Sequence, residues 1–384
     1  MKHLVIRLFN YSIIQLFIIV NCIGCVTEYI PPDIEEITDI LVVEGIITDD
    51  ESVITLSRSV NLMNGEYWDP VYVDNANVYI ECDDGTQWQA EPLPLSFSSL
   101  SPSRNGRYII KTGQLNLERK YSLKIEIEEI VNSKDCTNNP WGGITCPTKT
   151  YKYVSDFSHP IKTPEIDSIF WIKIGQGRPV MIHVSTHSPQ NEPMYYRWSY
   201  KEDWEYHSEI HASGHPIICW STANNRDILL GSAEKTVFGQ ITDKILDISP
   251  SEERLSVLYR ITVKQNAISK RAHDYFTNIK KNAENMGSIF APTPSELRGN
   301  ITCVTDPSRP VIGYIDVSST TQKKRHISGK DVYEKPYGGC EPVENPQSPL
   351  PSYLVETRTG IYYIDCVNCS YKGGTPIKPN DWLQ

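Results

Sequence analysis

Alternation of apolar and polar residues is the main pattern along this chain. It is clearest over residues 121–128, where Tyr, Leu and two Ile residues occupy the odd positions and polar residues the even ones. A two-residue period puts the apolar side chains on one face, which is typical of a half-buried strand. Similar short patterns predict further strands at residues 41–47, 53–57, 76–82, 106–110, 166–172, 180–184, 196–200, 227–231, 255–263, 311–315 and 353–356.

Turn signals separate these short segments. The triplet Asp83-Asp84-Gly85 predicts a hairpin turn, because Asp-Gly tolerates positive φ. Short strands joined by turns predict a mainly β fold. We expect an N-terminal immunoglobulin-like β-sandwich over residues 41–162 and a second β-rich domain over residues 163–384. Two prolines, Pro160 and Pro164, mark the boundary between them.

One segment of the second domain has helical rather than strand periodicity. Ser269 can cap it, and an apolar stripe at helical spacing follows, formed by Ala272, Tyr275, Phe276, Ile279 and Ala283. We therefore expect one amphipathic helix over about residues 269–286, ended by Gly287. Residues 135–158 and 320–352 are rich in polar residues and proline, and we expect them to be mostly loop.

The first 24 residues have the pattern of a secretory signal peptide. A short basic part precedes an apolar run over residues 8–20, and the segment closes on Gly24-Cys25. This ending resembles a bacterial lipobox, in which the Cys sulfur takes a diacylglyceryl group and the signal peptidase cuts before it. A plain signal peptide and a single membrane anchor remain as alternatives, although the apolar run is short for a bilayer span.

Lipidation at Cys25 would make it the mature N-terminus. Acyl chains such as palmitate would then hold the protein at a membrane, since two or more chains anchor a protein stably. Residues 25–40 contain Pro31-Pro32 and five acidic residues, and we expect a semi-extended tether there. No later segment approaches the roughly 20 apolar residues that a helical span needs.

Charge narrows the range of partners. The chain has 47 acidic and 37 basic residues and a formal net charge of −10. The expected leader contains Lys2 and Arg7 but no acidic residue, so its removal would make the mature chain more acidic. An acidic balance disfavours binding to nucleic acid or to anionic lipid. The length of 384 residues is enough for two or three domains.

Cysteine usage is typical of an exported protein. Ten Cys residues occur, and an even number remains once Cys22 is assigned to the leader and Cys25 to the lipid. Cys136 and Cys146 bracket a loop and are expected to pair locally. The connectivity of the other disulfide candidates stays open; they are Cys219, Cys303, Cys340, Cys366 and Cys369. The Cys366-x-x-Cys369 pair could also ligate zinc or exchange thiols, but the exported context favours structural disulfides.

Several short motifs, taken in order, resemble one family. The run Leu41-Val42-Val43-Glu44-Gly45-Ile46-Ile47-Thr48-Asp49 opens the fold. It is followed by Ala76-Asn77-Val78, Gly106-Arg107-Tyr108, Pro164-Glu165-Ile166-Asp167-Ser168, Tyr196-Arg197-Trp198, Cys219-Trp220, Gly299-Asn300-Ile301, Gly313-Tyr314 and the ending around Cys366-Val367-Asn368-Cys369. This order resembles domain of unknown function 4249, a family of outer-membrane lipoproteins of Bacteroidetes. The resemblance implies a lipid-anchored protein of the outer membrane, surface-exposed or periplasm-facing, beside a TonB-dependent receptor. It transfers no catalytic residue.

The sequence offers few candidates for a chemical site. It contains no nucleophile elbow, zinc-protease helix, phosphate-binding glycine loop or dinucleotide fingerprint, and we expect no cofactor. His207, His211 and His215 would share one face of a helix and could bind a metal, but Gly214 and Pro216 favour a solvated loop.

An aromatic-rich segment around residues 195–220 is the remaining candidate. Aromatic side chains bind sugars and peptides and anchor interfaces, although alternate members must face the core of a strand. We expect Trp204 and Tyr206 to be the exposed members that contact a ligand or partner.

These observations predict a non-enzymatic lipoprotein. It would support nutrient uptake through a TonB-dependent outer-membrane receptor by binding either the cargo or the receptor. A structural or adhesive cell-surface module is the main alternative, and fold alone does not separate the two. A secreted hydrolase with a convergent site is the third hypothesis, since such sites leave no local sequence signature.

Overall fold

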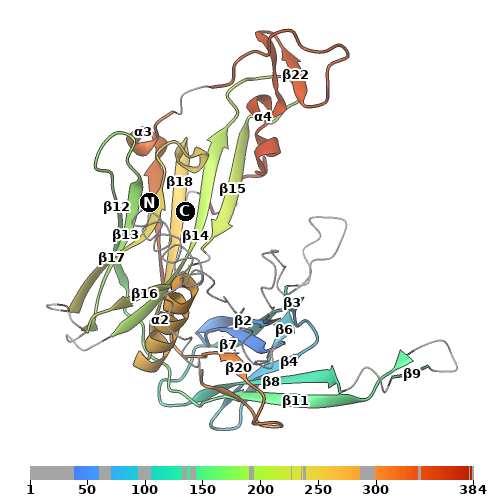
Figure 1. The fold of residues 1–384 in the computed structure, drawn as a ribbon. Helices are drawn as coiled ribbons and strands as arrows, with labels where there is room; N and C mark the ends of the chain where they lie inside the picture. The colour runs from blue at the N-terminus through green and yellow to red at the C-terminus, as the bar shows by residue number, and fades with distance from the viewer. Residues whose placement is uncertain are drawn as a thin grey trace, which may run out of the picture. The chain divides into compact units, whose positions relative to one another are not determined.

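The computed structural model describes residues 39–59, 71–93, 105–131, 136–138, 144–189, 194–225, 227–234, 236, 239–285, 299–335, 339–379 and 381–382. The predicted leader, Cys25 and the tether as far as residue 38 lie outside the described residues. Most of the elements in the described residues are strands, and the prediction of a mainly β fold is confirmed (Figure 1). The immunoglobulin-like topology stays a prediction.

Two sheets form a first sandwich. One sheet contains, in order, β20 (Val311–Gly313), β1 (Leu41–Gly45), β2 (Asp50–Arg58), β7 (Arg107–Gly113) and β6 (Glu91–Pro92), with β3 (Val71–Tyr72) beside β2. The other contains β19 (Ile301–Cys303), β11 (Thr148–Ser155), β8 (Tyr121–Ile130), β4 (Asn77–Cys82) and β5 (Gln87–Gln89). A separate short hairpin consists of β9 (Thr137–Asn138) and β10 (Ile144–Thr145).

The apolar faces of these two sheets form one core. On β4 the buried side chains are Val78, Ile80 and Cys82, at every second position. On β8 the odd positions from 121 to 127 are all buried, so the predicted alternation is confirmed. Both sets pack in one cluster with side chains of β1, β2 and β7. Full burial of one such aliphatic side chain contributes about 1.5–3 kcal/mol.

The predicted hairpin turn joins β4 to β5. Gly85 has a φ of 88°, and its backbone N–H donates to the carbonyl oxygen of Cys82 at 3.0 Å. The left-handed backbone at this position explains why Gly follows Asp84.

A second sandwich is built around the longest strand of the described residues. Its three-stranded sheet contains β12 (Ile166–Ile172), β13 (Val180–His187) and β17 (Gln240–Ile248). Its five-stranded sheet contains β15 (Ile218–Asn224), β14 (Tyr195–His207), β18 (Leu258–Ile268) and β21 (Thr320–Ser328), with β16 (Leu229–Ser232) also paired to β14. Strands β14, β15 and β18 lie side by side (Figure 1). The two sheets share a second core, which includes Ile182, Trp198 and Ile261.

Two segments predicted as loop contain strands. The prediction for residues 320–352 is wrong over β21, which pairs with β18 along nine residues. Its polar sequence, Thr-Thr-Gln-Lys-Lys-Arg-His-Ile-Ser, follows from its place at the edge of the sheet, where charged side chains are common. The prediction for residues 135–158 is wrong over β11, which pairs with β8 and buries Tyr153.

The first core also receives residues from late in the chain. Strand β20 pairs in parallel with β1, and β19 pairs with β11, although both strands lie far beyond the boundary predicted at residue 162. Ile315 and Val317 are buried in the same core. Residues 301–317 therefore belong with the first sandwich, which corrects the assignment of all residues from 163 to 384 to the second domain. The sequence pattern predicts the strand at residues 311–315, but it does not indicate that β1 is its partner.

Helix α2 (Lys270–Asn285) is the helix predicted at residues 269–286. The backbone N–H of Ala272 donates to the Ser269 hydroxyl at 3.2 Å, so Ser269 caps the helix as predicted. Ala272 and Tyr275 are buried on its apolar stripe. Gly287, the predicted end, lies outside the described residues. The other helical segments are short: η4 (Glu253–Leu255), α3 (Gly329–Val332), α4 (Ile364–Val367) and η5 (Cys369–Lys372).

Three disulfides join the described cysteines. Cys136–Cys146 is the predicted local pair, while Cys219–Cys369 and Cys340–Cys366 hold the C-terminal segment with its hairpin of β22 (Leu354–Thr357) and β23 (Gly360–Tyr363). The expectation that Cys303 forms a disulfide is wrong. Its thiol is free, as is that of Cys82, because both side chains point into the first core.

These two thiols should resist modification in the native protein. Cys82 and Cys303 are 3% and 2% exposed, and burial raises the pKa of the Cys82 thiol, which lowers its thiolate fraction. We expect a maleimide to label neither residue in buffer and both in denaturant, as read by peptide mass spectrometry. Labelling of either peptide without denaturant would contradict this packing.

Candidate functional site

The outer face of the five-stranded sheet carries a row of polar side chains. Along β14, Trp198 and Tyr200 point into the second core, so Ser199, Lys201 and Asp203 point to the opposite face. Antiparallel pairing aligns Lys201 with Thr262 and Asp203 with Arg260 on β18. The apolar-polar alternation that builds the core thus also assembles the polar face.

A break in strand pairing opens this face. One edge of β14 pairs with β16 over residues 195–198 and with β15 over residues 201–207. Between them, Asn225 takes the place of a strand: its side-chain oxygen accepts from the Tyr200 N–H at 2.8 Å, and its own N–H donates to the Tyr200 carbonyl at 3.0 Å. The backbone polar groups are satisfied while the space beside them stays open.

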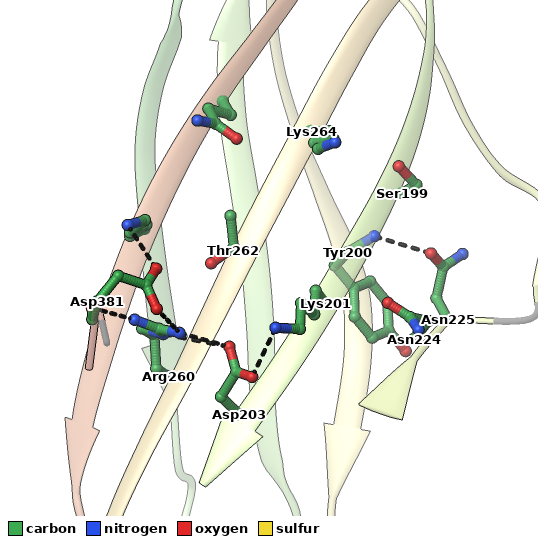
Figure 2. Close-up of a pocket in the computed structure, with 12 residues that line it drawn as sticks. Ser199, Tyr200, Lys201, Asp203, Asn224, Asn225, Arg260, Thr262, Lys264 and Asp381 are labelled. Carbon is green, nitrogen blue, oxygen red and sulfur yellow. Dashed lines mark hydrogen bonds and ion pairs between the residues drawn. The ribbon is translucent and has the colours of Figure 1, made fainter. Parts of the chain in front are cut away.

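A cavity of about 480 Å³ lies at this position, and we call it the sheet cavity. Figure 2 shows its lining side chains, which come from β14, β15, β18, β21 and the C-terminal tail. The tail is the segment that carries Asp381 and Trp382. Four are cationic and two are carboxylates: Lys201, Arg260, Lys264, Lys324, Asp203 and Asp381.

A buried guanidinium organises the lower wall of the sheet cavity. Arg260 is 1% exposed, and its Nη2 and Nε atoms donate to Asp203 Oδ2 at 2.7 and 3.2 Å. Its Nη1 donates to the Asp381 carbonyl oxygen at 2.5 Å and its Nη2 to Asp381 Oδ1 at 3.2 Å. The guanidinium therefore joins β14, β18 and the tail (Figure 2).

Two exposed lysines complete this network. Lys201 Nζ lies 2.9 Å from Asp203 Oδ1, and Lys324 Nζ lies 3.2 Å from Asp381 Oδ2. Burial acts to raise the pKa of Asp203, but hydrogen bonds from Arg260 and Lys201 outweigh it and lower that pKa. Hydrogen bonds from Lys324 and Arg260 lower the pKa of Asp381. Both carboxylates are thus ionised and fully engaged near neutral pH.

The tail closes one side of the network. The indole of Trp382 is 1% exposed, its ring centroid lies 5.3 Å from the Arg260 guanidinium, and its Nε1 donates to Glu205 at 3.2 Å. Such a cation–π contact adds about 0.5–2 kcal/mol. The tail is therefore a fixed wall of the sheet cavity.

The charge balance of the sheet cavity favours an anionic ligand. Three cations hold Asp203 and Asp381, because Arg260 contacts both carboxylates, and this network therefore has one formal positive charge in excess. Lys264 is exposed, and no described carboxylate pairs with it. Hydroxyl and amide groups of Ser199, Asn224 and Gln322 add neutral hydrogen-bond donors and acceptors.

Comparison with known proteins gives the family. The model of "Domain of unknown function (DUF4249)" matches residues 27–140 and 144–324. The chain belongs to this family. No curated protein matches the sequence of this DUF4249 member. Among solved structures, it is similar to one titled "Cytokine receptor complex - Crystal form 1A", at 12% identity over 75% of this chain and 96% of that chain. The TM-score of 0.17 is too low to support an argument.

The family match ends at residue 324, within β21. Most of the sheet cavity therefore lies in the matched part of this DUF4249 chain, whereas Asp381 and Trp382 lie beyond it. The motif at residues 366–369 that contributed to the resemblance also lies beyond it.

The predicted exposed aromatics have other roles in this DUF4249 chain. Tyr206 is 1% exposed, and its hydroxyl donates to the Cys369 carbonyl at 2.7 Å beside the Cys219–Cys369 disulfide. Trp204 is half-buried against the same cluster and the second core. The prediction that Tyr206 is exposed is wrong because the C-terminal segment covers this part of β14.

The three predicted histidines do not share a helix. His207 ends β14 and pairs with Glu205 at 2.9 Å, while His211 and His215 lie in the loop that follows. The loop interpretation is confirmed. Among the described residues, no group of three or more His, Cys, Asp or Glu side chains could hold a metal ion.

The residues of the sheet cavity were absent from the sequence-based candidates. Their signal is the alternation over residues 259–264, where Arg260, Thr262 and Lys264 interleave with core side chains. That alternation predicts a polar outer face, but it does not reveal that the neighbouring edge is broken at Asn225.

Proposed function

We propose that this chain is a membrane-anchored, non-enzymatic lipoprotein that acts as an accessory component of a TonB-dependent outer-membrane uptake system. The observation that carries the proposal is the leader ending in Gly24-Cys25, which supplies both export and a lipid anchor. No helix in the described ranges is both long and apolar enough to cross a bilayer. Membership of DUF4249 supports the proposal through the resemblance given above.

The sheet cavity gives the proposal a place for cargo. It concentrates positive charge on a chain whose formal net charge is −10, so it differs from the rest of the surface. A rigid face of paired strands holds its cations at fixed spacing, which favours specific binding over diffuse attraction. The cargo that suits it is a small anion with hydroxyl or carboxylate oxygens.

The anchor is the first thing to test. In protein purified from its native membrane, mass spectrometry should find Cys25 as the N-terminal residue with acyl chains on its sulfur. The Cys25→Ser variant should lack the acyl chains and serves as the matched control. An uncut leader or an unmodified Cys25 thiol would remove the basis of the proposal.

The partner requires a separate measurement. Extraction in mild detergent should co-purify a TonB-dependent receptor with the wild-type protein, and Cys25→Ser should reduce the yield of that complex. Repeated absence of any such receptor from the wild-type preparation would count against the accessory role.

A structural or adhesive surface module is the second candidate function. The observation in its favour is a pair of exposed tyrosines, Tyr353 and Tyr363, which are 54% and 52% exposed and stack at 6.3 Å on the disulfide-held hairpin. Tyrosine is common at protein contacts. Deletion of the gene should impair growth on the receptor's cargo if the first function holds, and attachment to surfaces if the second holds.

A further inference from the structure

A second cavity, of about 440 Å³, lies between β1, β14, α2 and the end of β20. We call it the Arg197 cavity. It adjoins the sheet cavity, because Ser199 and Asn225 line both. Its lining differs in residue type, since it contains more aromatic and aliphatic residues than that of the sheet cavity. Volumes of this size are at the small end of those that hold a single small ligand.

Arg197 is the unusual residue of this cavity. Its guanidinium lies 4.4 Å from the centroid of the Phe276 ring, which covers one of its planar faces. Among the described residues, none accepts a hydrogen bond from it and none forms an ion pair with it at salt-bridge distance. Burial lowers the pKa of Arg197, and the negative charge of Glu44 offsets only part of that effect.

The Arg197 side chain is partly buried and has no carboxylate partner among the described residues, so its guanidinium can accept a ligand from the cavity. Five N–H donors of a guanidinium need acceptors, and buried Arg side chains are normally paired with carboxylates, as Arg260 is in the sheet cavity. Such unpaired groups concentrate at binding sites, where a ligand supplies the missing acceptor. The planar guanidinium of Arg can donate two parallel N–H hydrogen bonds to the two oxygens of one carboxylate.

The other lining residues of the Arg197 cavity indicate which further chemical groups a ligand would have. Tyr275, Phe276 and Ile279 of α2 and Tyr314 after β20 form an apolar surface opposite β14. Two exposed carboxylates, Glu44 and Asp227, line the same cavity and would repel a simple anion. The lining thus combines one cation, two anions and an apolar surface.

We propose that the Arg197 cavity binds an α-amino acid with a large apolar side chain, either free or as the C-terminal residue of a short peptide. Arg197 receives the carboxylate, and the aromatic wall of α2 receives the side chain. Glu44 or Asp227 receives the ammonium group, which in a short peptide belongs to the N-terminal residue. This inference goes beyond the proposed accessory role, since it concerns binding by the isolated protein.

Phenylalanine is the probe, and three analogues each lack one of its groups. We expect the full-length protein in mild detergent to bind phenylalanine in a calorimetric titration at micromolar to millimolar concentrations. Phenethylamine lacks the carboxylate, 3-phenylpropionate lacks the ammonium group and alanine lacks the ring, and each should bind at least tenfold more weakly. Glycyl-phenylalanine separates the two sources, because tighter binding of the dipeptide identifies a peptide and weaker binding a free amino acid.

The Arg197→Gln variant tests the assigned contact. It should lose at least tenfold in affinity for phenylalanine and should no longer prefer phenylalanine over phenethylamine. Arg178→Gln, on the exposed loop before β13, is the matched control and should bind as the wild type does. Because the Arg197 side chain makes no hydrogen bond within the described residues, the variant should fold with an unchanged circular dichroism spectrum. Arg197→Lys should bind with intermediate affinity.

Three results would overturn this proposal. They are an absence of phenylalanine binding at millimolar concentration, equal binding of phenylalanine and phenethylamine by the wild type, and equal affinity of wild type and Arg197→Gln. None of them bears on the lipid anchor or the receptor, and loss of the anchor would leave this binding intact.

Discussion

Replacing Arg260 with methionine should lower the free energy of unfolding by about 3–5 kcal/mol, because it leaves a buried carboxylate without its main partner. Asp203 is 2% exposed and takes two hydrogen bonds from this guanidinium. Its remaining partner, Lys201, is half-exposed and supplies a single contact. Equilibrium unfolding in denaturant, followed by circular dichroism, measures the loss.

Two further variants separate this explanation from a loss of packing. Lys201→Met removes the exposed partner of the same carboxylate and should cost less than about 1 kcal/mol. The double variant Arg260→Met/Asp203→Leu removes both charges and should recover most of the stability, since an apolar pair of similar volume can replace a buried ion pair. A double variant no more stable than Arg260→Met alone would contradict the electrostatic account.

The same pair fixes the direction of the pH dependence. The pKa of Asp203 in the folded state is lowered, so the ionised form binds its partners more strongly in the folded chain than in the unfolded chain. The contribution is present above the ordinary pKa of an Asp side chain and is lost as the pH falls through the lowered folded value. Wild-type stability should therefore fall more steeply at acidic pH than that of Arg260→Met/Asp203→Leu.

Local periodicity in the sequence predicts most strands but not their partners. The two-residue alternation identifies β4 and β8 and their buried faces, because it depends only on neighbouring residues. The return of β19 and β20 to the first sandwich depends on pairing between residues 150 and 270 positions apart, respectively. Strand β21 has a polar sequence, so the hydrophobic signal that reveals an inner strand is absent from it.

The candidate sites show the same limit. The aromatic segment correctly indicates a strand, but which of its members is covered depends on the C-terminal segment, whose Thr375 pairs with Trp220. Arg260 and Asp203 are 57 positions apart in the sequence and meet only through the register of β14 and β18. Charged residues in alternation predict a polar face. The burial of Arg260 on that face depends on Asp381 and Trp382 of the tail, which the local pattern does not reveal.

Removing the Cys219–Cys369 disulfide should be the other change of large effect. Both cysteines are fully buried, and the bond closes a loop with a sequence separation of 150. Loop-closure entropy for that length predicts a stabilisation of about 5 kcal/mol, and native disulfides typically contribute about 2–5 kcal/mol. We expect Cys219→Ser/Cys369→Ser to lower the free energy of unfolding within that range.

The Cys136–Cys146 bond is the matched control. Its sequence separation is 10, so the same entropy argument gives about 3 kcal/mol or less for Cys136→Ser/Cys146→Ser. Equal losses for the two double variants would show that loop length does not govern the effect. Limited proteolysis should also distinguish them, because only the loss of Cys219–Cys369 frees the segment that carries Lys372 for cleavage by trypsin.

The disulfide and the buried guanidinium should be energetically coupled through the tail. Cys369 fixes the segment that carries Asp381 and Trp382, and both residues contact Arg260. Once the disulfide is lost, the tail contacts must form without a nearby attachment, and their contribution to Arg260 decreases. Arg260→Met should therefore cost less in the Cys219→Ser/Cys369→Ser background than in the wild type, by about 0.5–3 kcal/mol in a double-mutant cycle. Strict additivity would show that Asp203 alone, without the tail, determines the role of Arg260.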